Sequence, residues 1–323
     1  MTEPNLPVIA VADGAFATME QLSATYSDRA TLRTGPIGTP LEIAVTTAGA
    51  TALIVTLHPL RASHIAALAP SVEVIVRAGV GLDSIDVSAA RERGIRVVYQ
   101  PNYATNEVAD QAAALALAAW RRISQSDAGV RADGWTSAAE VGVVRAMQES
   151  TLGVIGTGRI GRSLISRLAP FFGRVVVFDA HRDPSLKDVE WANSAADVFR
   201  AAHLLSLHVP YTPDTHHLVD ADALASMPEG AIVVNVSRGG LIDEIALSDA
   251  LRAGRIAGAG LDVFETEPLP ADSPLRDAPN ILLTPHLAWY SVSSGERLAN
   301  WCILDAVSYS VDGSLPHGAM AWQ

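Results

Sequence analysis

The stretch Leu152-Gly-Val-Ile-Gly-Thr-Gly-Arg-Ile-Gly-Arg162 reads as a buried strand, a glycine-rich turn and the start of a helix. Gly156, Gly158 and Gly161 give the pattern G-x-G-x-x-G. The first glycine permits a tight turn, the second lets the backbone approach a pyrophosphate, and the third lets the helix pack on the strand. The helix N-terminus offers unpaired N–H groups and a positive dipole end to that anion.

A second strand, 175–179, follows the helix and ends in Asp179. An acidic residue about 20 positions beyond the glycines can accept a hydrogen bond from a ribose 2′-hydroxyl. Strand, helix, second strand and terminal Asp in this order predict a dinucleotide site. Arg182 could contact a 2′-phosphate, but the carboxylate of Asp179 would repel that group. We therefore expect NAD as the cofactor, with NADP less favoured.

Composition indicates an ordinary globular protein with room for two domains. The 323 residues are 49% hydrophobic and 18% charged, and the net charge of −12 is spread along the chain. No Lys/Arg stripe is present to neutralise phosphates, which argues against nucleic acid as a partner. The single cysteine, Cys302, excludes an internal disulfide and cysteine-cluster metal sites.

No membrane or export segment is expected. The residues from Met1 to Pro7 lack the basic and apolar regions of a signal peptide. The longest uncharged apolar run, Ala112–Trp120, is too short to span a bilayer. These features predict a cytoplasmic protein.

The remaining pattern predicts two α/β domains with parallel sheets. Strands are expected at 8–12, 52–57, 72–76 and 96–99, with helices near 62–69 and 87–93, and this first domain has no phosphate loop. In the second domain they are expected at 152–155, 175–179, 203–209, 231–236, 258–263 and 281–284, which predicts a six-stranded doubly wound sheet.

The chain is expected to cross between domains twice. Turn-forming residues at 100–107 mark the first crossing, before a helix over 109–122. A helix from about 291 to 311 would return to the first domain. We therefore assign 1–100 and 290–323 to a discontinuous, flavodoxin-like substrate domain, and 101–289 to an inserted Rossmann domain. The mixed segment 123–149 reads as a surface or interface arm.

Three chemically active residues follow the last strands of the second domain: Arg238, Glu267 and His286. Because ligands of doubly wound sheets bind beyond the carboxyl ends of the strands, these residues are expected at the dinucleotide site. An arginine can bind a carboxylate through two hydrogen bonds, a histidine can supply a proton, and a glutamate can orient and charge the histidine. Taken singly, each could instead be a surface or structural residue.

Five ordered motifs together resemble the NAD-dependent D-2-hydroxyacid dehydrogenases. They are Gly156–Gly161, Leu207–Pro210, Asn235–Gly239, Leu261–Phe264 with Glu267-Pro268, and Thr284–His286. The resemblance covers nearly all of the chain after about residue 70. It implies hydride transfer between NAD(H) and a small 2-oxo or 2-hydroxy acid, with Arg238, Glu267 and His286 as the catalytic set.

The resemblance also implies a set of cofactor contacts beyond the glycines. These are Arg159, Ile160, Asp179, His208, Val209, Pro210, Thr215, Val236, Ser237 and Asp262, the last of them near the carboxamide. The pair His216-His217 could suggest a metal, but no third ligand has suitable spacing, so no metal site is expected.

Within the family, Arg77–Asp83 and His286–Ser291 look most like the C-terminal-binding-protein branch, with phosphoglycerate dehydrogenases close. This implies that Arg77 and the N–H groups of Val80 and Gly81 bind the substrate, and that Trp289 walls the pocket. The alternatives are a salt bridge for Arg77 and a core or interface aromatic for Trp289. The family and the 123–149 arm also imply a homodimer.

Departures from the family leave the substrate open. The chain ends soon after the returning helix, so a regulatory tail and control by an amino acid are not expected. Residues 13–60 match loosely, which leaves the acid unidentified. Two other functions remain possible: an NAD(H)-sensing, corepressor-like binding protein with weak turnover, or a dehydrogenase of a phosphonate-type anion.

Overall fold

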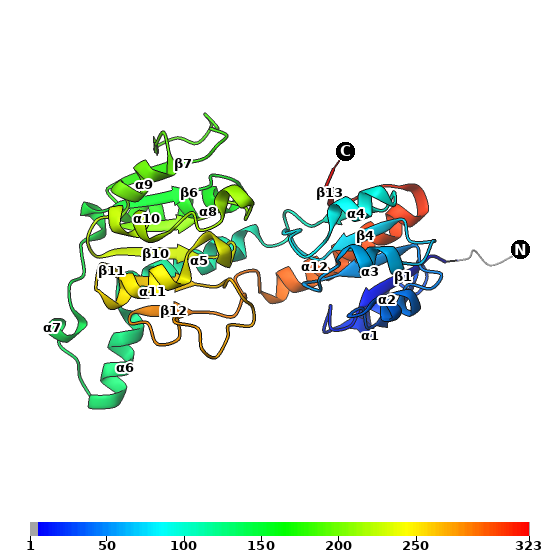
Figure 1. The fold of residues 1–323 in the computed structure, drawn as a ribbon, viewed down its shortest axis with the longest axis horizontal. Helices are drawn as coiled ribbons and strands as arrows, with labels where there is room; N and C mark the ends of the chain where they lie inside the picture. Colours follow the sequence, from blue (N-terminus) through cyan, green and yellow to red (C-terminus); the bar gives the residue numbers. More distant parts are fainter. Residues whose placement is uncertain (1–5, 323) are drawn as a thin grey trace, which may run out of the picture. The chain divides into compact units, whose positions relative to one another are not determined.

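The structure is a computed structural model that describes residues 6–322. Residues 1–5, part of the N-terminal stretch in which no signal peptide is expected, lie outside the described range. The chain forms two compact units (Figure 1). Unit 1 joins Met1–Tyr103 to Ser291–Gln323, and unit 2 is Ala104–Tyr290.

Unit 2 contains a seven-stranded parallel sheet. Its strands are β6 (Thr151–Ile155), β7 (Arg174–Phe178), β8 (Glu190–Trp191), β9 (Leu204–Leu207), β10 (Ala231–Asn235), β11 (Ile256–Leu261) and β12 (Ile281–Leu283). Their order is β12-β11-β10-β9-β6-β7-β8, and every paired neighbour is parallel. This is the doubly wound order of a Rossmann fold, with the switch point between β6 and β9. The prediction of six strands missed β8, which has only two residues and no apolar pattern.

Helices cover both faces of this sheet. Helix α5 (Thr105–Trp120) and α8 (Arg159–Leu168) enclose one apolar core, and α9 (Ala195–Ala201), α10 (Ala221–Ser226) and α11 (Glu244–Arg252) enclose the other. Since both faces are covered, the central strands β6, β9 and β10 are buried throughout, as parallel strands require. Single 3₁₀ turns occur at Met147–Glu149, Ala169–Phe171, Pro213–Thr215 and Gly239–Leu241.

Helices α6 (Ile123–Asp133) and α7 (Ala138–Val141) do not contribute to either core. None of their residues is buried, and Figure 1 shows them extending away from the rest of unit 2. The expected surface arm at 123–149 thus corresponds to an exposed segment of two helices.

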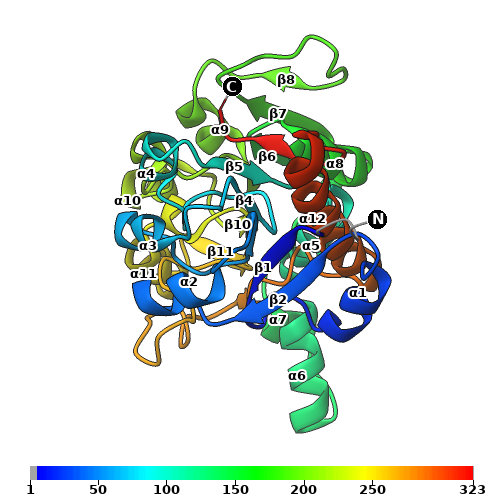
Figure 2. The same ribbon diagram turned by 90° about the vertical axis from the view of Figure 1, so that its right-hand side faces the viewer.

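Unit 1 contains a second sheet, ordered β13-β5-β4-β3-β1-β2. Its strands are β1 (Val8–Ala12), β2 (Thr31–Gly35), β3 (Ala52–Val55), β4 (Val74–Arg77), β5 (Arg96–Tyr99) and the antiparallel β13 (Ala319–Met320). The five parallel strands have the flavodoxin-like order. Figure 2 shows α2 (Pro40–Thr46), α3 (Ala62–Ala67) and α4 (Val87–Glu92) on one side of the sheet, and α1 (Met19–Thr25) and α12 (Val292–Asp312) on the other.

The sequence reading of unit 1 was incomplete. It missed β2, β13, α1 and α2. Strand β2 is an edge strand whose residues are only partly buried, so it lacks the continuous apolar run that identifies β1 and β3. The two-residue β13 depends on pairing with Val98 and Tyr99, which is a tertiary contact.

No helix among residues 6–322 is long and apolar enough to cross a membrane.

Candidate active site

The three glycines of the turn between β6 and α8 differ in the steric room around them. Gly156 has φ +93°, and a Cβ there would lie 2.4 Å from the carbonyl oxygen of His208. A Cβ on Gly161 would lie 2.0 Å from the carbonyl oxygen of Gly156. A Cβ on Gly158, at the N-cap of α8, would meet no atom within 4 Å. Open space beside the N-terminus of a ten-residue helix therefore fits a dinucleotide phosphate.

Asp179 follows β7 and borders this turn. Its Oδ2 accepts hydrogen bonds from the N–H (2.7 Å) and hydroxyl (3.1 Å) of Thr157, and its Oδ1 accepts one from the N–H of His181 (2.9 Å). Burial raises the pKa of the Asp179 carboxyl, but these hydrogen bonds outweigh it and the pKa is lowered. The ionised carboxylate suits a ribose hydroxyl and repels a phosphate.

Arg182 lies close in sequence but is engaged elsewhere. Its guanidinium donates to the carbonyl oxygen of Ala192 (2.7 Å) and to Oδ1 of Asn193 (3.0 Å). It also lies over the Trp191 ring, 5.9 Å from the centroid. The guanidinium that could have contacted a 2′-phosphate is therefore bonded to the residues at and after β8 instead.

The other residues expected at the cofactor lie along the same edge of the sheet. His208 follows β9, and its Nε2 is 2.9 Å from the Ser206 hydroxyl, while Nδ1 is buried without a hydrogen-bond partner. Desolvation lowers its pKa from 6.5 to about 4, so the ring is neutral at pH 7. The remaining expected contacts, in the first turn of α8 and in the segments after β9 and β10, are Arg159, Ile160, Val209, Pro210, Thr215, Val236 and Ser237.

Two of these residues donate side-chain hydrogen bonds to backbone carbonyl groups. The Thr215 hydroxyl donates to the carbonyl oxygen of Pro210 (2.8 Å), and the Ser237 hydroxyl donates to that of Leu207 (2.8 Å). The second bond joins the loop after β10 to the end of β9.

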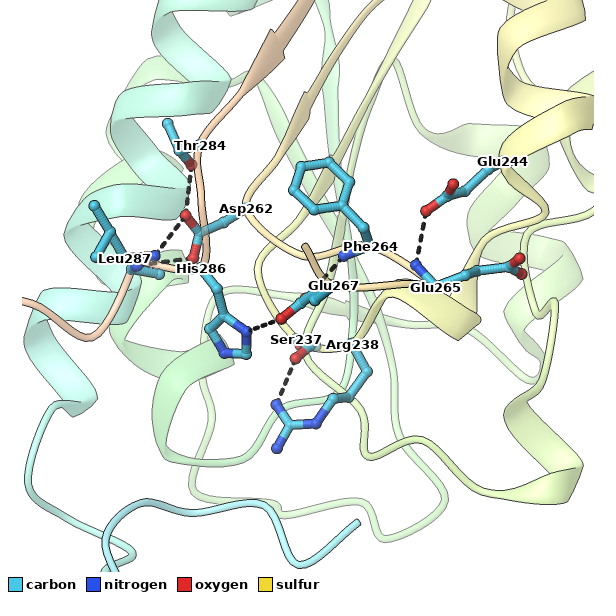
Figure 3. Close-up of polar contacts among 11 residues, drawn as sticks. Ser237, Arg238, Glu244, Asp262, Phe264, Glu265, Glu267, Thr284, His286 and Leu287 are labelled. Carbon is cyan, nitrogen blue, oxygen red and sulfur yellow. Dashed lines mark hydrogen bonds and ion pairs between the residues drawn. The ribbon is translucent and has the colours of Figure 1, made fainter. Parts of the chain in front are cut away.

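The three expected catalytic residues follow β10, β11 and β12, at the carboxyl edge of the sheet. Nδ1 of His286 lies 2.6 Å from Oε2 of Glu267, and Oε1 of Glu267 accepts a hydrogen bond from the N–H of Phe264 (3.0 Å). Figure 3 shows the imidazole facing this carboxylate, with the Arg238 guanidinium beside them. The guanidinium donates to the carbonyl oxygen of Ser237 (2.7 Å).

Electrostatics within this group favour an ionised Glu267. Burial raises the pKa of the Glu267 carboxyl, but the hydrogen bonds from His286 and Phe264 and the positive charges of His286 and Arg238 outweigh it. The pKa of Glu267 is therefore lowered. An ionised carboxylate at Nδ1 accepts a strong hydrogen bond from the imidazole and fixes its orientation.

Backbone packing brings these loops close together. Gly239 has no room for a side chain, because a Cβ there would lie 1.8 Å from the carbonyl carbon of Phe264. Asn235 is buried and donates to the carbonyl oxygen of Arg238 (2.8 Å), while it accepts the N–H of Ser237 (3.0 Å). The turn after β10 is thereby fixed against the loop that carries Glu267.

Sequence reasoning did not identify a second carboxylate beside Glu267. Glu244, the first residue of α11, accepts the N–H of Glu265 (2.7 Å) through its side chain. Burial, followed by the charges of Glu265 and Glu267, raises the pKa of Glu244. An acidic residue in the first turn of a helix is ordinarily explained by the helix dipole. Nothing in the sequence therefore indicated that this carboxylate would contact the loop that carries Glu267.

The residues expected at the substrate belong partly to unit 1. Arg77 ends β4 with 6% of its surface exposed, and its guanidinium donates to the carbonyl oxygen of Ala78 and packs against Gly79. Val80, in the following loop, is 41% exposed, and Gly81 is half-buried. In unit 2, the half-buried Trp289 meets the Tyr290 ring edge-on, with centroids 5.5 Å apart.

The carboxylate of Asp262 is hydrogen-bonded to three groups of the protein. The residue is fully buried, and its carboxylate accepts hydrogen bonds from the Thr284 hydroxyl (2.5 Å) and the N–H groups of Leu287 (3.0 Å) and Ala288 (2.7 Å). Among the described residues, no cluster of three or more His, Cys, Asp or Glu side chains could hold a metal ion.

Comparison with known proteins identifies the family. Residues 113–288 match the family model for the NAD binding domain of D-isomer specific 2-hydroxyacid dehydrogenases. The D-3-phosphoglycerate dehydrogenase of Mycobacterium leprae is 39% identical over 298 residues, which are 91% of this chain and 55% of that protein. The chain thus spans about half the length of that relative.

Two further relatives match this chain over most of the length of both proteins. The glycerate dehydrogenase of Methylorubrum extorquens is 36% identical over 282 residues, covering 85% of this chain and 87% of that protein. The crystal structure of the TT0316 protein from Thermus thermophilus is 33% identical, covers 97% of this chain and 100% of its own, and superposes with a TM-score of 0.85. The chain therefore belongs to the D-isomer specific 2-hydroxyacid dehydrogenase family.

Proposed function

We propose that this protein is an NAD-dependent dehydrogenase that interconverts a small 2-oxo acid and its D-2-hydroxy acid. The observation that carries the proposal is the hydrogen-bonded pair of His286 and Glu267 beside Arg238, at the carboxyl edge of a Rossmann sheet. Unit 2 would hold the dinucleotide. The names of the relatives, a phosphoglycerate dehydrogenase and a glycerate dehydrogenase, agree with a hydroxy acid substrate.

The bound nicotinamide supplies hydride chemistry at the substrate's C2. Arg238 binds the substrate carboxylate and polarises the neighbouring carbonyl, since a guanidinium offers two parallel donors. His286 donates a proton from Nε2 to the carbonyl oxygen during reduction and accepts it during oxidation. Glu267, bonded to Nδ1, holds the ring in orientation and stabilises its positive charge.

On the substrate side we propose Arg77 as a second cation, with the N–H groups of Val80 and Gly81 as donors to the carboxylate. Trp289 would wall the pocket. For the cofactor we propose contacts from the glycine-rich turn, from Asp179 and from the loops after β9 and β10. NAD is preferred over NADP because Asp179 is ionised and Arg182 is held by Ala192 and Asn193.

We also propose that the protein is a homodimer joined through the α6–α7 segment. Its apolar side chains Val130, Trp135 and Val143 are 46%, 78% and 82% exposed. Exposed apolar side chains gathered on one segment mark an interaction surface. Light scattering should give twice the chain mass of 34.0 kDa, and Trp135→Asp should give the monomer.

A cytoplasmic location is proposed as well. The thiol of Cys302 is buried and its pKa is raised well above the ordinary value by burial and by Asp305, with Arg77 opposing. Such a thiol is inert and needs no oxidising compartment. Detection of the protein in a membrane or exported fraction of its source cells would contradict this assignment.

The direct test of the activity is oxidation of NADH, followed at 340 nm, across a panel of 2-oxo acids. The panel should include glyoxylate, pyruvate, hydroxypyruvate, branched, aromatic and phosphonate-bearing acids. His286→Ala should lower kcat/KM on the best substrate about 10²–10⁴-fold. Tight NADH binding without turnover of any acid would favour a cofactor-sensing protein instead.

A further inference from the structure

Asp262 is surrounded by the segment that carries His286. Besides the three bonds to its carboxylate, its carbonyl oxygen accepts the N–H of His286 (2.8 Å). Residues on both sides of His286 are therefore held by one residue at the end of β11, through its main chain and its side chain (Figure 3).

His286 needs such support because of its backbone conformation. Its φ is +55°, in the left-handed region that residues other than glycine rarely adopt. A residue in this region keeps its conformation only when the surrounding structure enforces it. The bonds from Asp262 to residues 286, 287 and 288 are the contacts that enforce it here.

Thr284 and Gln111 extend these contacts. Nε2 of Gln111 donates to the Thr284 hydroxyl oxygen (3.2 Å), and that hydroxyl donates to Oδ1 of Asp262 (2.5 Å). The amide donor directs the hydroxyl proton toward the carboxylate, because the oxygen already accepts from the other side. Gln111 lies on α5, so the chain of bonds fixes the His286 segment to a helix of the unit 2 core.

We propose that Asp262, Thr284 and Gln111 form a positioning network that holds the imidazole of His286 in line with the carboxylate of Glu267. The network acts through the backbone of residues 284–288 and needs no contact between Asp262 and the cofactor. Three of the four lone-pair positions of the Asp262 carboxylate are occupied by protein donors. The proposal rests on the proposed dehydrogenase function, because it concerns the same acid/base residue.

Thr284→Val tests the network by removing one hydroxyl from a side chain of similar shape. The main measurement is the NMR signal of the Nδ1–H proton of His286 in the free protein, assigned with His286→Gln. We expect this signal to move upfield or to be lost by exchange with solvent in Thr284→Val, since a misaligned Glu267 accepts the hydrogen bond from Nδ1 less well. The charged groups around the pair, Glu244, Arg238 and Asp262, are unchanged in this variant.

The kinetic measurements separate positioning from cofactor binding. In Thr284→Val we expect kcat to fall about tenfold, the size of a partly lost acid/base contribution, with the Kd for NADH within about twofold of wild type. Thr284→Ser keeps the hydroxyl and should restore both kcat and the Nδ1–H signal of His286. Ser248→Ala is the control, because it removes a different hydroxyl of unit 2, a buried one that donates to the carbonyl oxygen of Pro274. It should leave both quantities unchanged.

The outcomes are distinct. An unchanged Nδ1–H signal of His286 and an unchanged kcat in Thr284→Val would overturn the network, and so would a loss confined to NADH affinity. A changed Nδ1–H signal in Thr284→Val, when the wild-type protein reduces no 2-oxo acid, would support the network while refuting the dehydrogenase function. If Thr284→Val does not fold, Gln111→Leu decides the question, because it perturbs the same hydroxyl from α5 and should change the signal in the same direction.

Discussion

Nδ1 of His286 lies 2.6 Å from Oε2 of Glu267, and each residue has a further hydrogen bond to the backbone. Oε1 of Glu267 accepts the N–H of Phe264, and the N–H of His286 donates to the carbonyl oxygen of Asp262. Contacts within the protein therefore orient the pair, which is the arrangement expected of a preorganised acid/base group.

Replacing Glu267 by Gln should lower kcat for reduction about 10²-fold. The neutral amide accepts the hydrogen bond from Nδ1 of His286 more weakly than the carboxylate does, so the imidazole is less well oriented for proton transfer. The steady-state rate of NADH oxidation at pH 7 measures this, and a wild-type kcat in the variant would exclude the role.

The same carboxyl makes a separate prediction for stability. The pKa of Glu267 is lower in the folded protein than its ordinary value of 4.5. Its stabilising contribution is therefore fully present above pH 4.5 and is lost as the pH falls through the lower, folded value. The difference in melting temperature between wild type and Glu267→Gln should be largest near neutral pH and should shrink below about pH 4.

The sequence was sufficient for the parts of the site that depend on motif and topology. Once the strands are parallel, residues following β10, β11 and β12 must lie at one edge, so Arg238 and His286 could be assigned to it. The bonds from Asp262 to residues 284–288 could not be predicted, because they depend on the conformation of an irregular loop. Glu244 and β13 were missed for a related reason: each is defined by a tertiary contact that leaves no local pattern.

Two glycines of the turn should respond differently to alanine. Gly158→Ala meets no protein atom within 4 Å, so it should fold normally and weaken NADH binding about tenfold or more by occupying the space for the pyrophosphate. Gly161→Ala places its Cβ 2.0 Å from the Gly156 carbonyl oxygen and should lower the free energy of unfolding by roughly 1–3 kcal/mol or more. Fluorescence titration with NADH and urea unfolding separate the two effects. Equal stability losses in both variants would contradict this account.

Cofactor preference should depend on Asp179 and not on Arg182. Wild type should use NADH at least about tenfold better than NADPH, because an ionised carboxylate faces the position of the 2′-phosphate. Asp179→Ser should narrow that ratio by removing the charge. Arg182→Gln is the control: since this guanidinium already bonds to Ala192 and Asn193, its loss should change the ratio by less than about twofold. A large change in the control would mean that Arg182 reaches the cofactor.

Protonation of His208 should destabilise the folded protein at pH values higher than those at which carboxylates protonate. Its folded pKa is about 4 against an ordinary value of 6.5, because desolvation disfavours the charged ring and Nδ1 is buried without a partner. The unfolded chain therefore binds more protons between these values, and stability is lost as the pH falls from 6.5 to 4. Although Nδ1 is buried, the residue as a whole is partly exposed. The loss therefore stays below the roughly 3 kcal/mol that the full pKa difference would give.

Urea unfolding of wild type and His208→Asn at pH 7 and pH 4.5 tests this prediction. Asn removes the titrating group, so the variant should lose less stability than wild type between the two pH values, whatever its stability at pH 7. The exposed His181 offers the matched control, and His181→Asn should follow the wild-type change. If wild type and His208→Asn lose equal amounts of unfolding free energy between pH 7 and pH 4.5, protonation of His208 does not destabilise the folded protein.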